Sequence, residues 1–318
     1  MLKVLYLPIG SQAGTVDAWN AVGVELAVYD FHGVWDHTHN KSIVTQKFLK
    51  MVESFRPNLI HMQLQLTGLL DANTLIEAKR ICPGVIISNW SGDVRANAVP
   101  NFTNIAGSID YTLISSTGQL DMYKRAGCNN IKYWQIGYDP KNSHPLNYTD
   151  FKYDVSFLGN NYGRTFPDGG LRLSVATSLR KEFGNKFGLY GSGYSPPAPI
   201  VDPSDANKIY NNSICALSIS NFNNISHYFS DRLLYCLASG RPTISWYFPG
   251  FENYFVEGQE IFIARSVKDV IEIVNYCKNN PDIANKVGTN GYLRVFKEHT
   301  FTSRIIELLH MINLIHLV

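Results

Sequence analysis

The chain has 318 residues, of which 45% are hydrophobic and 13% aromatic, a composition that can build sizeable cores. This length is too great for one small domain and suits two domains of about 150 residues each. Charged residues make up only 17% of the chain and the net charge is +2, so overall charge gives no reason to expect a nucleic acid or a membrane surface as partner, although a local basic groove remains compatible with it.

The N-terminal run MLKVLYLPIG has one lysine and a short apolar segment before glycine. No small-residue cleavage site follows, so the run predicts a first strand and no targeting segment. No apolar run approaches the ~20 residues that a membrane span requires. The cysteines form no C-x-x-C pair and mostly lie in apolar segments, which favours buried free thiols over disulfides or zinc ligands: Cys82, Cys128, Cys215, Cys236 and Cys277. We therefore expect a soluble protein in the reducing cytoplasm.

Short apolar runs alternate with helical patterns through the first half of the chain. The runs that predict strands are 3–10, 23–31, 58–65, 85–93, 111–116 and 131–140. The runs with helical patterns are 42–57, 70–84 and 117–127. Short apolar strands that alternate with helices are typical of a parallel sheet covered on both faces.

The segment 137–154 breaks this pattern, because it is rich in Pro, Asn, Asp and Tyr and therefore suits a linker. The alternation then restarts, with strands predicted at 155–161, 186–194, 213–220, 242–248 and 261–266, and helices at 171–184, 230–240 and 267–280. The predicted fold class is α/β, with two consecutive Rossmann-like, doubly wound domains at 1–148 and 149–318. Ligands of such sheets bind at the carboxyl ends of strands, so the expected site is a cleft between the domains.

The last segment, 301–318, is apolar and helical. It lacks the basic polar face of a helix that lies on a lipid surface. We therefore expect it to pack on its own domain or back across the cleft.

The segment SDRLLYCLASGRP, residues 230–242, is the strongest candidate for chemistry. Ser230 is a good N-cap, and the first amides of the following helix form an anion site together with the helix dipole. Arg232, in the first turn, can add a bidentate contact to a phosphate oxygen. The same residues also fit the ordinary start and stop signals of a helix, since Gly240 and Pro242 end the segment and Arg232 can be a surface residue. Both interpretations stay open on these residues alone.

A longer string favours the phosphate interpretation. The segment 230–242, with the run from PGFENYF to RIIELL (249–309) and YDVSFLGNNYGR (153–164), resembles the C-terminal domain of CgeB/YkvP-like glycosyltransferases, in the glycosyltransferase family 1/4-like group. The resemblance covers about residues 150–310, while the first half matches mainly in layout. It implies the GT-B fold, with an acceptor domain at 1–148, a nucleotide-sugar donor domain at 149–318 and a cleft between them.

The resemblance also implies where a donor would bind. The diphosphate of a nucleotide sugar, such as a UDP-sugar, would lie at the start of the Ser230 helix near Arg232. Two glycines, Gly191 and Gly193, would let the backbone approach the nucleotide closely, although plain turns explain them equally well. The implied donor-binding residues are Gly159, Asn160, Arg164, Gly191, Gly193, His227, Ser230, Asp231, Arg232 and Tyr235.

Two positions depart from the broader retaining superfamily, in which two glutamates eight residues apart flank this helix and the second contacts the donor ribose. His227 and Tyr235 stand at these positions, and neither is a carboxylate. A tyrosine can stack or donate one hydrogen bond, but it cannot accept two hydroxyl donors as a carboxylate does. The departure leaves the nucleotide open and keeps an alternative function, a non-catalytic GT-B-like protein that binds a nucleotide sugar or a glycan.

The acceptor is expected on the first domain. The loop after the first strand offers backbone amides, and the run NWSGDVR follows the fourth strand. An aromatic platform beside a carboxylate suits sugar stacking and orientation of a hydroxyl, although a turn with a capping aspartate explains this run as well. The predicted acceptor-side residues are Gly10, Ser11, Gly14, Trp90, Asp93 and Arg95.

The signals for metals and cofactors are weak. Asp36, His37 and His39 form one short cluster on a loop, without a distant partner. The chain has no D-x-D motif of metal-dependent transferases, and GSQAGT rather than G-x-G-x-x-G follows the first strand, which disfavours a nicotinamide-linked oxidoreductase. We therefore expect neither a metal nor a cofactor.

These features together predict a retaining, metal-independent hexosyl- or pentosyltransferase that moves sugar from a nucleotide sugar to an acceptor hydroxyl. The acceptor is either a surface or spore glycan or a hydroxymethylated base in phage DNA. The Asn-rich composition fits a viral or AT-rich genome, but the first domain has no basic run for phosphate contacts. His61 fits a hydrogen-bonded core histidine at least as well as a catalytic one. The predicted catalytic residues are Asp93, Arg232 and His61.

Overall fold

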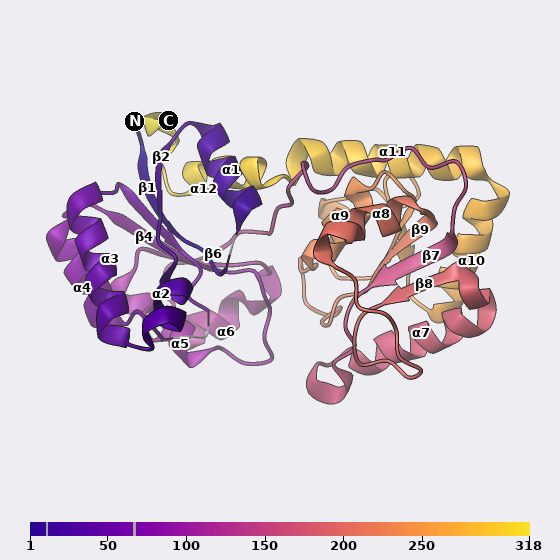
Figure 1. Ribbon diagram of the computed structural model, residues 1–318, viewed down its shortest axis with the longest axis horizontal. Coiled ribbons are helices and arrows are strands. Elements are labelled where there is room, and N and C mark those ends of the chain that lie inside the picture. Colours follow the sequence, from indigo (N-terminus) through magenta and orange to yellow (C-terminus); the bar gives the residue numbers. More distant parts are fainter. Residues whose placement is uncertain (11, 66–67) are drawn as a thin grey trace. The chain divides into compact units, whose positions relative to one another are not determined.

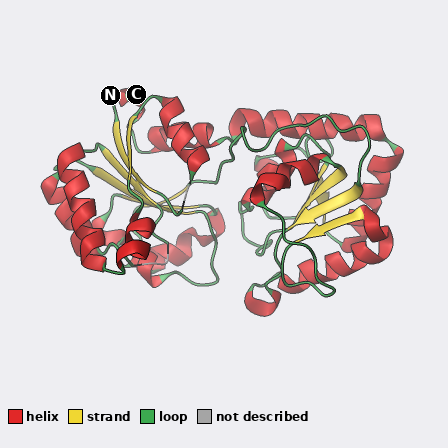
Figure 2. Ribbon diagram, in the orientation of Figure 1, coloured by secondary structure: helices red, strands yellow, loops and turns green. Residues whose placement is uncertain are grey.

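The computed structural model describes residues 1–10, 12–65 and 68–318. The chain divides into two compact units, one comprising Met1–Ile136 with Phe301–Val318 and the other Gly137–Thr300. Each unit contains a parallel sheet flanked by helices (Figures 1 and 2), so the predicted α/β fold class is confirmed. The division differs from the predicted boundary at residue 148, because 137–148 lies in the second unit and 301–318 in the first.

The first unit is built on a sheet with the strand order β2-β1-β3-β4-β5-β6, in which neighbouring strands run parallel. Its strands are β1 (Lys3–Leu7), β2 (Glu25–Val28), β3 (Leu59–Met62), β4 (Ile86–Ser91), β5 (Tyr111–Ile114) and β6 (Ile131–Tyr133). Its helices are α1 (Ala13–Val22), α2 (Phe31–Thr38), α3 (Lys41–Phe55), α4 (Ala72–Ile81), α5 (Pro100–Thr103), α6 (Leu120–Arg125) and α12 (Phe301–Met311).

The alternation of side chains along β1 explains why both faces of this sheet are covered. Leu5 and Leu7 lie in the core formed with α3 and α4. Val4 and Tyr6 lie in the core on the other face, formed with α1 and α12 (Figure 1). All four side chains are fully buried. The last helix of the chain therefore completes the core of the first unit.

The second unit is built on a sheet with the order β11-β10-β9-β7-β8, again with parallel neighbours. Its strands are β7 (Tyr153–Leu158), β8 (Phe187–Tyr190), β9 (Ser213–Ser218), β10 (Thr243–Trp246) and β11 (Phe262–Ala264). Its helices are α7 (Gly169–Phe183), α8 (Ala206–Asn211), α9 (Asp231–Ala238), α10 (Val267–Asn279) and α11 (Pro281–Glu298).

Neighbouring residues of β7 again divide the helices between two faces. Phe157 belongs to the core that α7 and α10 cover. Leu158, the next residue, belongs to the cluster formed with Tyr210 of α8 and Cys236 of α9. Figure 1 shows α8 and α9 on the opposite side of the sheet from α7. The carboxyl end of β7 therefore lies between α7 and α9, the two helices that supply the candidate site.

The segment predicted as a linker is fixed to the second unit by two asparagines of α8. Asn211 is 1% exposed, and its Oδ1 accepts a hydrogen bond from Leu146 N at 2.6 Å. Its Nδ2 donates to His144 O at 3.1 Å, as does Nδ2 of Asn207. These amide contacts hold the middle of the segment, while Tyr138 forms an isolated bridge with Thr300 and the last two residues begin β7.

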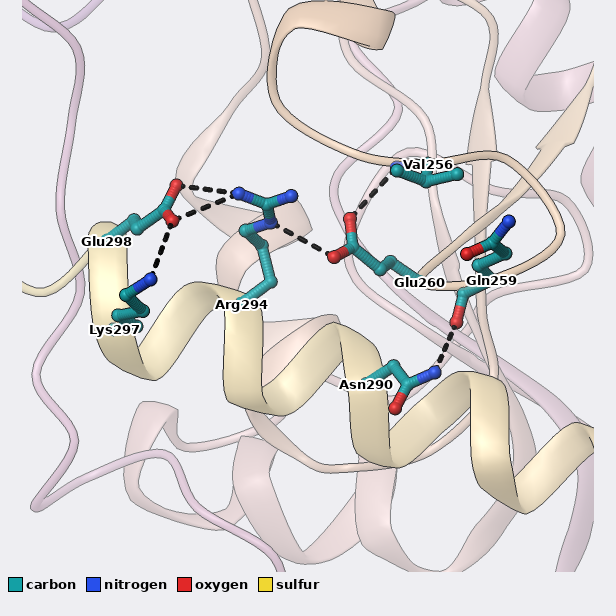
Figure 3. Close-up of polar contacts among 7 residues, drawn as sticks. All are labelled: Val256, Gln259, Glu260, Asn290, Arg294, Lys297 and Glu298. Atoms are coloured by element: carbon teal, nitrogen blue, oxygen red, sulfur yellow. Dashed lines mark hydrogen bonds and ion pairs between the residues drawn. The ribbon is translucent and has the colours of Figure 1, made fainter.

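A network of charges joins α11 to the segment before β11 (Figure 3). Arg294 Nε donates to Glu260 Oε1 at 3.1 Å, and Arg294 Nη1 lies 2.9 Å from Glu298 Oε2. The other oxygen of Glu260 accepts from Val256 N at 2.9 Å. The Glu260 side chain is only 16% exposed, so the arginine is the cation that compensates a largely buried carboxylate.

The predicted strands are all present, but several helices were not predicted. The structure adds α1, α2, α5, α8 and α11, and Asp36 and His37 lie on α2, which corrects the prediction that the cluster around His39 is a loop. The described residues include all five cysteines, and each is a buried free thiol. Within the described ranges, no helix combines the length and apolar character that crossing a membrane requires.

Candidate functional site

The start of α9 lies near the carboxyl ends of β7 and β9. Ser230 holds the N-cap position, but within the described part of the chain its side chain makes no capping hydrogen bond. The predicted N-cap position of Ser230 is therefore confirmed, but its Oγ accepts from Arg232 Nη1 at 3.4 Å instead of from a helix amide. The Arg232 amide donates to Asp231 Oδ1 at 2.8 Å. The Asp231 carboxylate thus accepts from one of the first amides of α9.

The Arg232 guanidinium is anchored by main-chain carbonyl groups at the ends of two strands. Its Nε donates to Leu158 O, the last residue of β7, and its Nη1 donates to Ile219 O, just after β9, at 3.0 Å. Its Cζ lies 5.4 Å from the centroid of the Phe157 ring. A Cβ built on Gly159 would come within 2.9 Å of Nη2. The guanidinium therefore has one orientation, with Nη2 beside Gly159.

A second arginine reaches the same place from α7, and sequence reasoning missed it. Arg172 is 2% exposed, and its Nε and Nη2 donate to Ile219 O at 3.1 and 2.6 Å. Its Nη1 donates to Asn160 O at 2.7 Å. Burial, and secondly the charge of Arg232, lower the pKa of Arg172 to about 9. A single arginine inside a helical pattern carries no local signal of such a role.

The two arginines form a cluster of positive charge that no carboxylate compensates. Across residues 1–10, 12–65 and 68–318, neither Arg172 nor Arg232 takes part in an ion pair. Both donate to the oxygen of Ile219, and both lie within 6 Å of the Phe157 ring, with Cζ at 5.8 and 5.4 Å from its centroid. A guanidinium fixed in this way at the strand ends of an α/β unit, as that of Arg232 is, can bind an anion, above all a phosphate, and the buried charge of Arg172 adds to the positive charge beside it.

The glycines at this edge let two loops touch. Gly191 and Gly193 have φ of 128° and 82°, values that side chains rarely allow. A Cβ on Gly191 would come within 2.5 Å of Gly159 O, and one on Gly193 within 1.9 Å of Asn161 O. The loop after β8 therefore lies directly on the loop after β7. This packing accounts for both glycines, and a contact of either with a nucleotide stays a prediction.

The predicted donor residues Asn160 and Arg164 lie in the loop after β7. Asn160 Oδ1 accepts from Ser192 N at 2.9 Å, and its Nδ2 donates to the Tyr162 hydroxyl at 3.3 Å. Arg164 is exposed in the short turn Gly163–Thr165, and no hydrogen bond or ion pair joins it to another described residue. Asn160 thus joins the two loops, while Arg164 is a solvent-facing cation.

His227 and Tyr235, which stand where the resemblance predicts two glutamates, have different surroundings. His227 has a φ of 58°, and its Nε2 lies 3.0 Å from Asn253 Nδ2 in the loop after β10. Tyr235 lies one turn after Asp231, and burial, together with the charge and hydrogen bond of Asp231, raises the pKa of its phenol. The phenol therefore stays neutral, and it lies one helical turn from the carboxylate of Asp231.

The loop after β1 is shorter than expected. Gly10 lies in it with a φ of 63°, but Gly14 is the second residue of α1, and Ser11 lies outside the described residues. Gly14 is therefore part of a helix and not of a glycine-bearing loop. The amides that α1 presents at its start come from Ala13 onward.

The run after β4 is only partly the surface that the sequence predicted. Trp90 is 6% exposed, its ring meets that of Trp134 edge-on at 4.9 Å, and its Nε1 donates to Trp134 O at 3.1 Å. This burial corrects the prediction that Trp90 is an open platform for a sugar. Asp93 is 58% exposed and its Oδ2 lies 3.1 Å from Arg95 Nη2. The carboxylate and guanidinium do come together on the surface.

His61 lies in the core of the first unit. Its ring is 1% exposed, stacks on Tyr6 with centroids 5.8 Å apart, and has Nδ1 2.9 Å from Ser88 Oγ. Burial lowers the pKa of the imidazole to about 3. In the described chain its Nε2 has no hydrogen-bond partner. A ring enclosed in this way cannot reach a substrate, so the structure supports the core interpretation over the catalytic one.

The cluster of Asp36, His37 and His39 does not assemble a metal site. His37 Nδ1 lies 2.8 Å from Gly33 O on its own helix, and His39 meets Trp35 edge-on. Among the residues that the structure describes, no group of three or more His, Cys, Asp or Glu side chains could hold a metal ion.

The second half of the chain matches a known protein family. Residues 172–310 match a protein-family model described as glycosyl transferase-like. The matched segment begins at Arg172 and includes Arg232. No curated protein matches the chain.

The whole chain resembles solved structures. It is similar to Anabaena Alr3699/HepE in complex with UDP-glucose, with 10% identity over 98% of this chain and 100% of that one and a TM-score of 0.63. It is also similar to a glycosyltransferase from Rickettsia africae ESF-5, at 12% identity over 99% and 98% and a TM-score of 0.64. A third likeness is to sucrose-phosphate synthase (tll1590) from Thermosynechococcus elongatus, at 10% identity over the full length of both chains and a TM-score of 0.61. These likenesses show the GT-B fold, while the CgeB/YkvP-like group stays a prediction.

Proposed function

We propose that this protein is a glycosyltransferase that moves a sugar from a nucleoside-diphosphate sugar to an acceptor hydroxyl. The observation that carries the proposal is the uncompensated pair of Arg172 and Arg232 at the ends of β7 and β9. The glycosyl transferase-like match over 172–310 and the GT-B fold support it. UDP-glucose is bound by one protein of similar fold, so a UDP-sugar is the first donor to test.

In the proposed reaction the bond between the anomeric carbon and the β-phosphate oxygen breaks, and a bond to the acceptor oxygen forms. Negative charge grows on the leaving diphosphate, and the proton of the acceptor hydroxyl passes to that diphosphate. Nη2 of Arg232 and the Asp231 amide, the first of α9, are the donors proposed to stabilise that charge, since the next amide already donates to Asp231 Oδ1. This is the basis for proposing a metal-independent reaction, and retention of the anomeric configuration follows only from the family resemblance. A cytoplasmic setting stays a prediction.

We propose an uncharged glycan hydroxyl as the acceptor, rather than a hydroxymethylated base in DNA. The segments 1–136 and 301–318 carry 12 Lys and Arg against 11 Asp and Glu, so the first unit is close to neutral. DNA binding draws much of its affinity from phosphate contacts, which need an excess of cations. Asp93, held by Arg95, is the exposed carboxylate proposed to orient the hydroxyl.

The test is transfer or hydrolysis of nucleotide sugars by the wild type and by Arg232→Ala. We expect the variant to lose more than tenfold in rate, because the leaving diphosphate loses a charge-assisted contact. Arg80→Ala, at a side chain that is 73% exposed in the first unit, is the control and should keep the wild-type rate. A folded Arg232→Ala protein with an unchanged rate would contradict the assignment.

The same assay distinguishes the transferase from the second candidate function, a non-catalytic binding protein. The absence of the two glutamates favours this second candidate. A non-catalytic protein would bind a nucleotide sugar, seen as a rise in Tm, but would neither transfer nor hydrolyse it. His227 and Tyr235 are the observation behind this candidate, since neither supplies a carboxylate. A panel of UDP-, GDP-, ADP- and CMP-sugars covers both outcomes.

A further inference from the structure

We propose that Arg172 is a positioning residue for the diphosphate of the donor, acting through Arg232 and through the carbonyl groups of Asn160 and Ile219. The inference rests on the proposed function, since it concerns the same site. It adds a residue that lies outside the motif at the start of α9 and that cannot itself contact a ligand, because only 2% of it is exposed.

The guanidinium of Arg172 connects the chain segments that follow β7 and β9. Its Nη1 donates to Asn160 O in the loop after β7, while its Nε and Nη2 both donate to Ile219 O after β9, at 3.1 and 2.6 Å. One planar guanidinium therefore fixes the spacing of two loops that border the site. A lysine, with a single nitrogen, cannot make these three contacts in the same directions.

Arg172 is coupled to Arg232 by shared partners. The Ile219 oxygen accepts from Arg232 Nη1 at 3.0 Å in addition to its two bonds from Arg172. The Phe157 ring, 1% exposed, lies near both guanidinium groups, with Cζ at 5.8 and 5.4 Å from its centroid. A shift of Arg172 would therefore move the carbonyl that holds Arg232.

The charge of Arg172 also requires an explanation beyond hydrogen bonding. Neutral donors could satisfy the carbonyls of Asn160 and Ile219, whereas a buried cation costs free energy unless something compensates it. Its neighbour is a second cation, and no carboxylate in the described ranges forms an ion pair with either arginine. A ligand with several negative charges at Arg232 would supply the missing compensation, because the field of a buried charge is weakly screened.

The control for this idea is Arg241, at the opposite end of β9. Its Nε donates to Ser213 O at 3.1 Å, its Cζ lies 4.2 Å from the Phe151 centroid, and burial lowers its pKa. Arg241 thus shares a carbonyl partner and a ring with Arg172, but it is only partly buried and lies at the amino end of the strand and not at the site. Arg241→Met measures what a purely structural arginine of this kind contributes.

The experiment is calorimetric titration of the full chain with inorganic pyrophosphate, UDP, UMP and uridine. We expect Arg172→Met to raise the Kd for pyrophosphate and UDP at least tenfold, to raise that for UMP less, and to leave that for uridine within twofold. Arg172→Lys, which keeps the charge but loses the planar fork, should recover part of the loss, whereas Arg172→Gln should not. The Kd of Arg241→Met should stay within twofold of the wild-type value for every ligand, even if its Tm falls as much as that of Arg172→Met.

The outcomes separate the two proposals. Pyrophosphate and UDP binding by Arg172→Met within twofold of the wild type would overturn the positioning role and leave the transferase proposal standing. Equal losses for pyrophosphate and uridine would also overturn it, because they indicate a general loss of structure. A third outcome is that the wild type binds pyrophosphate but no nucleotide sugar, while the Arg172 variants show the predicted losses in pyrophosphate binding. This outcome would support the role of Arg172 and contradict the proposed function. If Arg172→Met does not fold, the Kd values of Arg172→Lys and Arg172→Gln for pyrophosphate decide instead. Equal values for these two variants would overturn the positioning role.

Discussion

The His61 imidazole links the stability of the first unit to pH. Its pKa is lowered to about 3 in the folded protein, against an ordinary value near 6.5 in the unfolded chain. Between these values the unfolded state binds a proton that the folded state does not, so the free energy of unfolding falls as pH drops below about 6.5. We expect a contribution of about 2 kcal/mol to be lost between pH 7 and pH 5, since each pH unit below 6.5 costs about 1.4 kcal/mol.

Urea unfolding of the wild type and of His61→Asn at pH 7 and pH 5 measures this effect. The variant should lose stability at both pH values, but the difference between the two should shrink by about 2 kcal/mol. His316→Asn, at an exposed histidine of the same unit, should keep the wild-type difference. An unaltered pH dependence in His61→Asn would show that the ring is protonated in the folded protein or reaches solvent.

Single residues differ in how far their roles can be predicted from the sequence. Arg232 could be predicted because it lies in the first turn of a helix, where local pattern and chemistry coincide. Arg172 could not, because its role depends on Ile219 and Asn160, which tertiary structure alone brings near it. Trp90 was misassigned for the same reason, since the sequence cannot show that Trp134 covers its ring. Side chains that act through tertiary contacts leave no local pattern.

At the scale of elements, α11 is fixed to the segment before β11 by Arg294 (Figure 3). We expect Arg294→Met to lower the free energy of unfolding by about 1–3 kcal/mol, because Glu260 would be left largely buried without its cation. Lys297→Met on the same helix should change it by less than about 0.5 kcal/mol, since this lysine is 81% exposed and lies 3.8 Å from Glu298.

Chemical denaturation of both variants tests the contrast. The double variant Arg294→Met with Glu260→Gln should recover part of the loss, because no buried charge would then lack a partner. Equal effects of the Arg294 and Lys297 substitutions would show that the carboxylate of Glu260 is solvated and does not depend on the arginine.

Strands were easier to predict than helices. Most strands here are short apolar runs, because both faces of each sheet are covered, and of the described strands only edge strands such as β2 carry exposed residues. Helix α11 was missed because it contains Gly288 and Gly291, which read as helix breakers. A Cβ on Gly288 would come within 2.4 Å of Gly240 O, and one on Gly291 within 2.4 Å of Glu260 O. The glycines allow this helix to approach its neighbours, a requirement that only the folded structure reveals. Helix α1 has no capping side chain among the described residues, so its start had no signal either.

At the scale of the whole molecule, the sequence predicts two α/β units in succession but not that the first is completed by the end of the chain. The apolar periodicity of 301–318 shows that α12 has a face to bury. It does not specify which sheet receives that face, because both sheets offer similar apolar surfaces. The structure assigns the segment to the first unit, where Trp134 Nε1 donates to Arg304 O at 2.8 Å. Residues 1–136 are therefore an incomplete core by themselves.

This arrangement predicts that a substitution near the C-terminus weakens the first unit selectively. Leu308 is fully buried in the core formed with Val4 and Tyr6, so Leu308→Ala should cost about 2–5 kcal/mol, while Ile306→Ala, at a side chain 39% exposed on the same helix, should cost far less. Hydrogen exchange measured by mass spectrometry locates the effect, and protection should fall in peptides of β1 and α1 but not in those of β7 and α7. Equal loss of protection in both sets would mean that the two units unfold as one cooperative block, and no loss in either would mean that α12 is not part of the first core.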